Sequence, residues 1–293
     1  MDPETIRIRP IKPALSGYLK ESLVLLRRSR VPDDDAIHDI RVLMKKARAA
    51  MKLLHPCIGE KAFEDEYRTY RDAARMLASW RDMSVQRKTL RSVRKSNRKL
   101  FRRLEGYKPL DEIMKWENQS SEENMEIIRN IDEVETLLRK AWYRLRFMTI
   151  GEPDAALLYD QLNKSYMSAA ALCMECRINT RPQKVHELRK RIKDFLYQIY
   201  FFRPVNPAAV KSTEKRLDII SQNLGKYNDI SQIIAGLNYK YGNPGNPPEL
   251  DELVALLKGI QDRYLADVWS SAFKIFKPGQ KLQALLGITI LRM

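Results

Sequence analysis

A row of basic side chains follows one face of a predicted helix near the start of the sequence. The row consists of His38, Arg41, Lys45, Arg48 and Lys52, spaced by three and four residues. This spacing places side chains above one another on a helix. Apolar residues flank the row on both sides, whereas a solvated face would merge into polar residues. Because like charges at this spacing cost about 0.2–0.5 kcal/mol per pair, we expect a ligand anion or distant carboxylates to neutralise the row.

A second basic row repeats the first one half a chain later. The segment IHDIR at 37–41 recurs as VHELR at 185–189, an offset of 148 residues. The second row comprises His186, Arg189 and Lys193, with Lys190 at its edge. Further along, LASWRDMS at 77–84 recurs as LGKYNDIS at 224–231, at an offset of 147. The repeat predicts two homologous helical halves related by a pseudo-twofold axis.

The two rows suit a linear polyanion. Bases recur about once per helical turn, roughly every 5.4 Å, so a chain of phosphates lying along the row would meet a new donor at each turn. Arginine offers a bidentate fork to phosphate oxygens, and lysine offers a compact charge. A bound phosphate would also raise the pKa of each row histidine and favour its charged form. Two rows facing each other across a twofold axis would line a basic channel.

Helical periodicity covers most of the chain, which therefore predicts an all-α protein. Its 293 residues include only 11 Gly and 14 Pro, and 44% are hydrophobic, enough for a sizeable core. The helices are predicted at about 14–30, 34–55, 60–79, 82–105, 122–149, 154–178, 183–203, 208–224, 228–241, 248–270 and 279–291.

Composition limits the partners and the compartment. The formal net charge of +16 implies an acidic partner, which could be nucleic acid, an anionic membrane surface or a phosphorylated polymer. No run of about 18 apolar residues is present, so we expect a soluble, cytoplasmic chain with no membrane partner. The three cysteines are Cys57, Cys173 and Cys176, with no second pair that would complete a zinc site. They are predicted to be ordinary reduced thiols, typical of an intracellular protein.

The doubled motif resembles the conserved histidine α-helical domain, or CHAD, family. In that family each His-acidic-x-Arg helix is followed by a Leu-Gly-x-x-Arg-Asp-like segment, as 37–41 is here by 77–82 and 185–189 by 224–229. The resemblance covers essentially the whole chain. It implies two four-helix-bundle-like halves, 1–148 and 149–293, around a central basic pore. It also implies that inorganic polyphosphate binds there without turnover, and that the protein associates with polyphosphate granules.

The resemblance also implies which residues bind polyphosphate. Matched position by position, they are His38, Arg41, Lys45, Arg48, Lys52, Arg81, His186, Arg189, Lys190, Lys193 and Asn228. The second half departs from the first at two positions: Asn228 stands where the first half has Arg81, and Leu196 where it has Arg48. We therefore expect the pore to be more basic on one side. Arg71, Arg75 and Lys226 are expected to add to its rim.

Three other readings remain open. A polyphosphate- or phosphate-ester-processing enzyme would need Mg²⁺ held by carboxylates, and neither row contains clustered Asp or Glu or a Gly-rich phosphate loop. We therefore expect no enzymatic activity, no cofactor and no metal. Nucleic-acid binding is disfavoured because the basic run at 81–108 has only Phe101 and Tyr107 interleaved. A scaffold whose rows are neutralised by a protein's acidic cluster is the third reading, and other phosphate or sulfate anions are alternative ligands.

Overall fold

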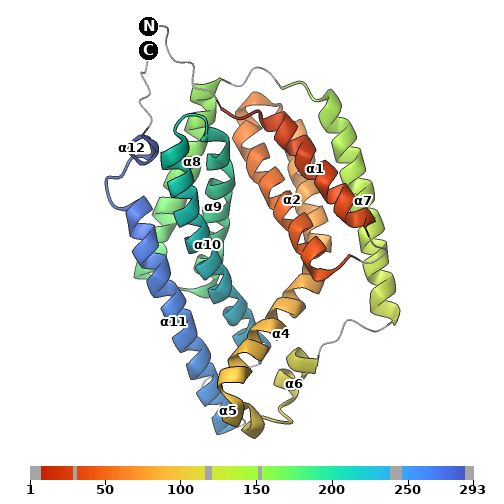
Figure 1. Cartoon of the computed structure of the whole chain (residues 1–293), viewed down its shortest axis with the longest axis vertical. Coiled ribbons are helices and arrows are strands. Elements are labelled where there is room, and N and C mark those ends of the chain that lie inside the picture. The colour runs from red at the N-terminus through yellow and green to blue at the C-terminus, as the bar shows by residue number, and fades with distance from the viewer. Residues whose placement is uncertain (1–7, 29–31, 116–120, 151–153, 238–245, 288–293) are drawn as a thin grey trace.

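Every regular element of the described chain is helical, which confirms the all-α prediction (Figure 1). The computed structural model describes residues 8–28, 32–115, 121–150, 154–237 and 246–287, with the backbone alone at 79–83, 115 and 121–127. Within those ranges no helix is long and apolar enough to cross a membrane. Cys57, Cys173 and Cys176 are free thiols, as the sequence predicts.

Four helices of the first half form a bundle. They are α1 (Ile11–Arg27), α2 (Asp34–Leu54), α3 (Glu60–Met76) and α7 (Ser121–Phe147), with the short helix η1 (His55–Cys57) after α2. α1 packs against α2 and α7, and α3 packs against the same two helices, so the four close into a ring. The Asp33 carboxylate caps α2 by accepting a hydrogen bond from the Ala36 N–H at 2.7 Å.

The second half repeats this arrangement. Its elements are α8 (Ala155–Ile178), α9 (Pro182–Ile199), η2 (Tyr200–Phe202), α10 (Pro207–Gly236), α11 (Pro248–Phe276) and α12 (Leu282–Leu286). α8 packs on α9, α9 on α10, α10 on α11, and α11 on α8. One apolar core of buried side chains runs through both bundles. The pseudo-twofold axis and the division at residue 148 stay predictions.

A third group of helices lies beside the lower ends of α10 and α11 (Figure 1). We call α4 (Ala78–Ser96), α5 (Arg98–Arg103) and α6 (Lys108–Lys115) the arm. The arm has an apolar core of its own, in which Leu90, Phe101 and Ile113 cluster with Ile233 of α10 and Leu253 of α11. The arm is therefore anchored to the second bundle although it follows α3 of the first bundle in the chain.

Two predicted boundaries inside the chain are wrong, and the helix predicted at 279–291 spans only Leu282–Leu286 within the described residues. α10 is continuous from Pro207 to Gly236, although the periodicity predicted a break after 224. Gly225 costs about 1 kcal/mol in a helix interior, but this glycine is buried where α10 packs on α9, and that packing outweighs the cost. The predicted helix at 82–105 is broken at Asn97, whose side-chain amide donates to the Val93 carbonyl at 2.9 Å and competes with the helix. The helix α6 was not predicted.

Candidate functional site: cations at the junction of the two bundles

The two basic rows lie on the helices that join the bundles. α2 packs on α9, α9 on α10, α10 on α4, and α4 on α2, so these four helices form a closed ring. At the crossing of α2 and α9, which we call the junction, the Gln198 side chain donates to the Ala49 carbonyl at 3.1 Å. The predicted pore would lie inside this ring of helices.

The first basic row is partly withdrawn from water along α2. His38 is exposed, whereas Arg41, Lys45 and Arg48 are half-buried. His38, Arg41 and Lys45 each interact with a neighbouring group. The Arg48 guanidinium lies 5.0 Å from the centre of the Tyr67 ring and donates to the Tyr67 hydroxyl at 3.0 Å. Among the described residues Arg48 has no ion pair, and its buried Nε has no acceptor, so its charge is held in place without being neutralised.

Three lysines of the rows, Lys52, Lys190 and Lys193, have carboxylate partners in the described structure. Lys52 Nζ lies 2.5 Å from Asp194 Oδ2, across the junction. Lys190 Nζ lies 3.1 Å from Glu187 Oε2, on the same helix. Glu187 reaches Lys190 because residues three apart lie on the same side of a helix. To bind a ligand anion, Lys52 and Lys190 would each have to contact it while still paired with a carboxylate.

Arg189 is the cation of the second row with the least compensation in the described structure. It is half-buried, and its guanidinium packs on Gly225: a Cβ at that glycine would lie 3.2 Å from Nε and 3.5 Å from Nη2. No described carboxylate pairs with Arg189, and its buried Nε lacks an acceptor. A buried donor without an acceptor costs about 1–3 kcal/mol. Gly225 therefore makes room for a cation that the described protein does not neutralise.

The surroundings of Lys193 disfavour its charged form. Burial lowers its pKa from the ordinary value, and the nearby charges of Arg189 and Lys46 lower it further. Asp218, whose Oδ1 lies 3.6 Å from Nζ, acts in the opposite direction without cancelling the shift. An anion placed beside these cations would reverse the shift.

His186, about two turns before Lys193 on α9, also lies in surroundings that disfavour its charged form. Its Nδ1 lies 3.1 Å from Asn228 Oδ1, which fits a ring whose Nδ1 carries a proton. Burial and the charge of Lys190 lower the pKa of His186, against the effect of the Asn228 hydrogen bond. The side chain of Arg81, which stands at the Asn228 position in the first half, lies outside the described residues.

The three residues expected at the rim have described partners outside the rows. Arg71 Nε lies 3.1 Å from Asp72 Oδ1, and Arg75 Nη2 lies 3.7 Å from the same oxygen, both on α3. Lys226 Nζ lies 5.4 Å from the centre of the Tyr264 ring, on α11. No described contact joins any of the three to either basic row.

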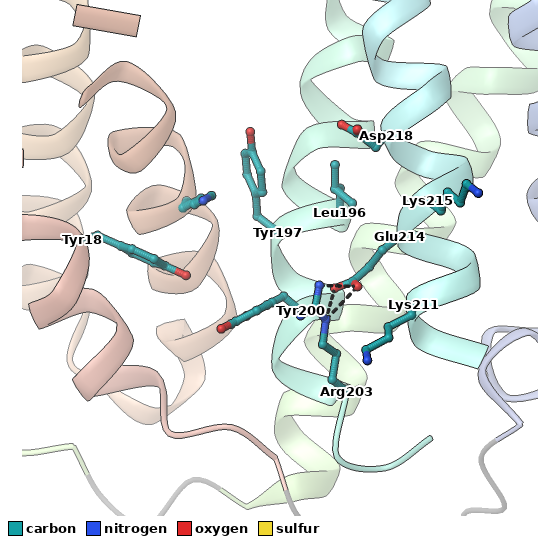
Figure 2. Close-up of a pocket in the computed structure, with 10 residues that line it drawn as sticks. Tyr18, Leu196, Tyr197, Tyr200, Arg203, Lys211, Glu214, Lys215 and Asp218 are labelled. Carbon is teal, nitrogen blue, oxygen red and sulfur yellow. Dashed lines mark hydrogen bonds and ion pairs between the residues drawn. The ribbon is translucent and has the colours of Figure 1, made fainter. Parts of the chain in front are cut away.

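A cavity of about 520 Å³ opens between α1 and α2 of the first bundle and α9 and α10 of the second (Figure 2). It is lined by Tyr18, Lys46, Leu196, Tyr197, Tyr200, Arg203, Lys211, Glu214, Lys215 and Asp218. Its cations were missed at the level of sequence. Lys46 follows Lys45 but projects about 100° away from the first row, and it meets Lys193 only because the bundles pack together.

Two tyrosines of this cavity, Tyr18 and Tyr197, keep their hydroxyl protons near neutral pH. Burial raises the pKa of Tyr18 to about 12, and the neighbouring Tyr200 adds to the shift. Burial also raises the pKa of Tyr197 to about 12, although Arg189 acts against the shift. Neutral hydroxyl groups beside cations can donate to the oxygens of an anion.

Comparison with known proteins gives one family and one fold. The pattern of the CHAD domain family matches residues 14–235. The crystal structure of the CHAD domain from the plant Ricinus communis is similar, with a TM-score of 0.52 and 16% sequence identity over 97% of this chain and 93% of that chain. At that identity the likeness shows the fold alone. No curated protein matches the chain.

Proposed function

The chain belongs to the CHAD domain family, and from that premise we propose that it binds inorganic polyphosphate at the junction without turning it over. One observation carries the proposal. Arg189 is a half-buried cation without an ion pair among the described residues, beside Lys193 and His186, whose pKa values are both lowered. Positive charge that is costly in the empty protein is stabilised when an anion binds.

A linear chain of phosphates fits this site better than a single anion. The cations come from both bundles and follow helices α2 and α9 over several turns, so one compact anion would leave most of them unused. The ring of α2, α9, α10 and α4 supports a pore that surrounds a slim chain. Charge-assisted contacts to each phosphate would then add along the chain.

The carboxylates at the junction support binding rather than reaction. Asp194, Glu187 and Asp218 each lie within ion-pair distance of a lysine of the rows. These ion pairs hold the lysine side chains in place and set the local charge. We assign no catalytic role to the three carboxylates. A location in the cytoplasm, in contact with polyphosphate granules, belongs to the same proposal.

Calorimetric titration with long-chain polyphosphate tests the function. A DNA oligonucleotide of equal charge is titrated in parallel, at low and at physiological salt. We expect polyphosphate to bind more tightly and to keep its affinity at physiological salt, since buried cations are less screened than exposed ones. Equal binding of both ligands, erased by salt, would reduce the site to a generic basic surface. Release of orthophosphate would contradict binding without turnover.

The matched variants are two charge reversals. Arg41→Glu with Arg189→Glu removes one cation from each row, and we expect a loss of at least about 100-fold, because a charged hydrogen bond contributes about 1.5–3 kcal/mol. Arg177→Glu with Arg263→Glu makes the same charge change at exposed positions of α8 and α11 and should change affinity by much less. Circular dichroism checks that both remain helical. Full affinity in the first variant would remove the proposed site.

A further inference from the structure

The arm carries a second cationic surface outside the junction. Ten of the residues at 84–108 are Lys or Arg and one is acidic. Six of these cations are exposed and have no ion pair among the described residues: Arg91, Arg94, Lys95, Arg98, Lys99 and Arg102. By contrast, Lys88 lies 2.9 Å from Asp34 and Arg103 pairs with Glu252. The arm therefore presents charge that the described protein leaves largely unneutralised.

The surface of the arm is hollowed where α4 ends. An open hollow of about 950 Å³ lies at the Asn97 break, and its cations are Lys95, Arg98, Lys99, Arg102 and Arg103, with Glu252 as its single acid. The break lets Leu100 and Phe101 enter the apolar core of the arm while the charged residues beside them stay outside. The break at Asn97 thus shapes both the apolar core of the arm and the basic hollow.

The chemistry of the arm favours a ligand that is recognised by phosphate charge alone. Phe101 is buried, and Tyr107 packs against the apolar core of the arm with its hydroxyl donating to the Leu237 carbonyl at 2.7 Å, so the described arm offers no fully exposed ring for a base to stack on. The large apolar side chains that are exposed in the described structure lie on α1, α7, α8, α10 and α11, and none is on the arm. The described arm thus lacks an anchor for a lipid surface.

We propose that the arm binds a second segment of the same polyphosphate chain that occupies the junction, so that long chains bind more tightly than short ones. This inference rests on the proposed function. α4 runs from the His38 end of the first basic row to the hollow: Ser84 donates to Asp34 in the first turn of α2, one turn before His38. From Ser84 to Lys95 the helix rises about 16 Å. A chain that leaves the junction at this end must span that length before it reaches the hollow.

A tethered second contact strengthens binding without any change at the first. Once one segment is held, the other searches only the volume its linker allows, and avidity can exceed either single affinity by about 10²–10⁴. A chain too short to span the two places gains nothing. Chain length therefore separates the arm from the junction in an experiment.

The test titrates long-chain polyphosphate and tripolyphosphate against an arm variant and a matched control. The arm variant is Lys95→Gln/Arg98→Gln/Lys99→Gln/Arg102→Gln. The control removes four exposed cations from the bundles, as Lys140→Gln/Lys164→Gln/Arg177→Gln/Arg263→Gln. We expect the arm variant to lose about tenfold or more for the long chain and nothing for tripolyphosphate. Its salt slope for the long chain should fall by about 3, if each contact counts as in single-stranded nucleic acid.

Three outcomes would overturn the inference. Unchanged long-chain affinity would show that the arm does not touch polyphosphate. An equal loss for both ligands would show that the arm only supports the junction, and thermal unfolding of the variant would reveal a folding defect. Duplex DNA is titrated in parallel, and a loss of DNA binding alone would make the arm a nucleic-acid surface. Failure of the proposed function would give a different result. Tripolyphosphate binding would then be insensitive to the Arg41→Glu/Arg189→Glu reversal in a protein whose arm is unchanged.

Discussion

α2 and α9 each carry a His, an Arg and a Lys at the same spacing, but the two helices differ beyond these residues. Both carry His, Arg and Lys in their first turns, but Leu196 of α9 stands where α2 has Arg48, and Tyr200 where it has Lys52. Leu196 and Tyr200 line the tyrosine-rich cavity instead. One repeated row has therefore become a charged face in the first half and a mixed, aromatic face in the second. We expect polyphosphate to depend more on α2 than on α9 beyond the shared turns.

Making the first half resemble the second should give the largest loss of affinity from a single substitution. Arg48→Leu copies the residue of α9 and removes a half-buried cation that has no ion pair in the described structure. Because a charge-assisted contact contributes about 1.5–3 kcal/mol, we expect at least about a tenfold loss of long-chain polyphosphate affinity by calorimetry. Leucine keeps an apolar contact with the Tyr67 ring, so the fold should survive.

Tyr67→Phe is the matched control for this variant. It removes the hydroxyl that accepts from Arg48 but keeps the ring beneath the guanidinium. We expect a smaller loss than with Arg48→Leu, since the cation remains. If Arg48→Leu bound as tightly as the wild type, the proposed inequality between the two halves would be wrong.

The pH dependence of polyphosphate affinity tests the role of His186 in the second half. The pKa of His186 is lowered by burial and by Lys190, whereas a bound anion would raise it. The complex then holds more protons than the free protein, so affinity should rise several-fold as pH falls from about 7.5 through the ordinary histidine value of about 6.5. Calorimetry in two buffers of different ionisation enthalpy measures the proton uptake directly.

His186→Gln should flatten that pH dependence. A slope identical to the wild type would assign the proton to another group, such as the exposed His38.

The lowered pKa of His186 also determines how the stability of the ligand-free protein changes with pH. Since the unfolded chain binds the His186 proton more tightly than the folded chain, this histidine's contribution to stability is full above about pH 6.5 and is lost as pH falls below it. Thermal unfolding of the free protein against pH checks this sign.

The smallest expected effect comes from the glycine under Arg189. Gly225→Ala would place a Cβ 3.2 Å from the guanidinium Nε, so the cation must shift by a few tenths of an ångström. We expect a loss of about two- to fivefold in affinity, because a charged contact worth about 1.5–3 kcal/mol would be weakened rather than lost. Alanine favours the helix by about 1 kcal/mol, so the unfolding temperature should stay level or rise.

The first half supplies the comparison for this substitution. Ala78 stands at the position of Gly225, and Ala78→Gly should lower stability without improving binding. A fall in stability but not in affinity for Gly225→Ala would mean that Arg189 does not set the binding strength of the second half.

The sequence alone determined the all-α class, the doubled rows and the family, since helical periodicity and a repeat offset are local properties of the chain. The two wrong helix boundaries mark the limit of that information. A glycine within α10 and an asparagine at the end of α4 look alike as interruptions, and only packing decides between them. Gly225 is buried against Arg189, whereas the half-buried Asn97 donates back to the Val93 carbonyl.

Only the tertiary structure decided which cations remain unneutralised. Lys52 meets Asp194 across 142 residues of sequence, and Lys46 lies near Lys193 although no repeat relates them. These contacts arise where helices distant in the chain cross, and an ion pair or a pKa shift depends on burial and distance rather than on spacing along one helix. The chain therefore encodes where its bases lie on each helix, and the packing of the two bundles determines what charge they present to an anion.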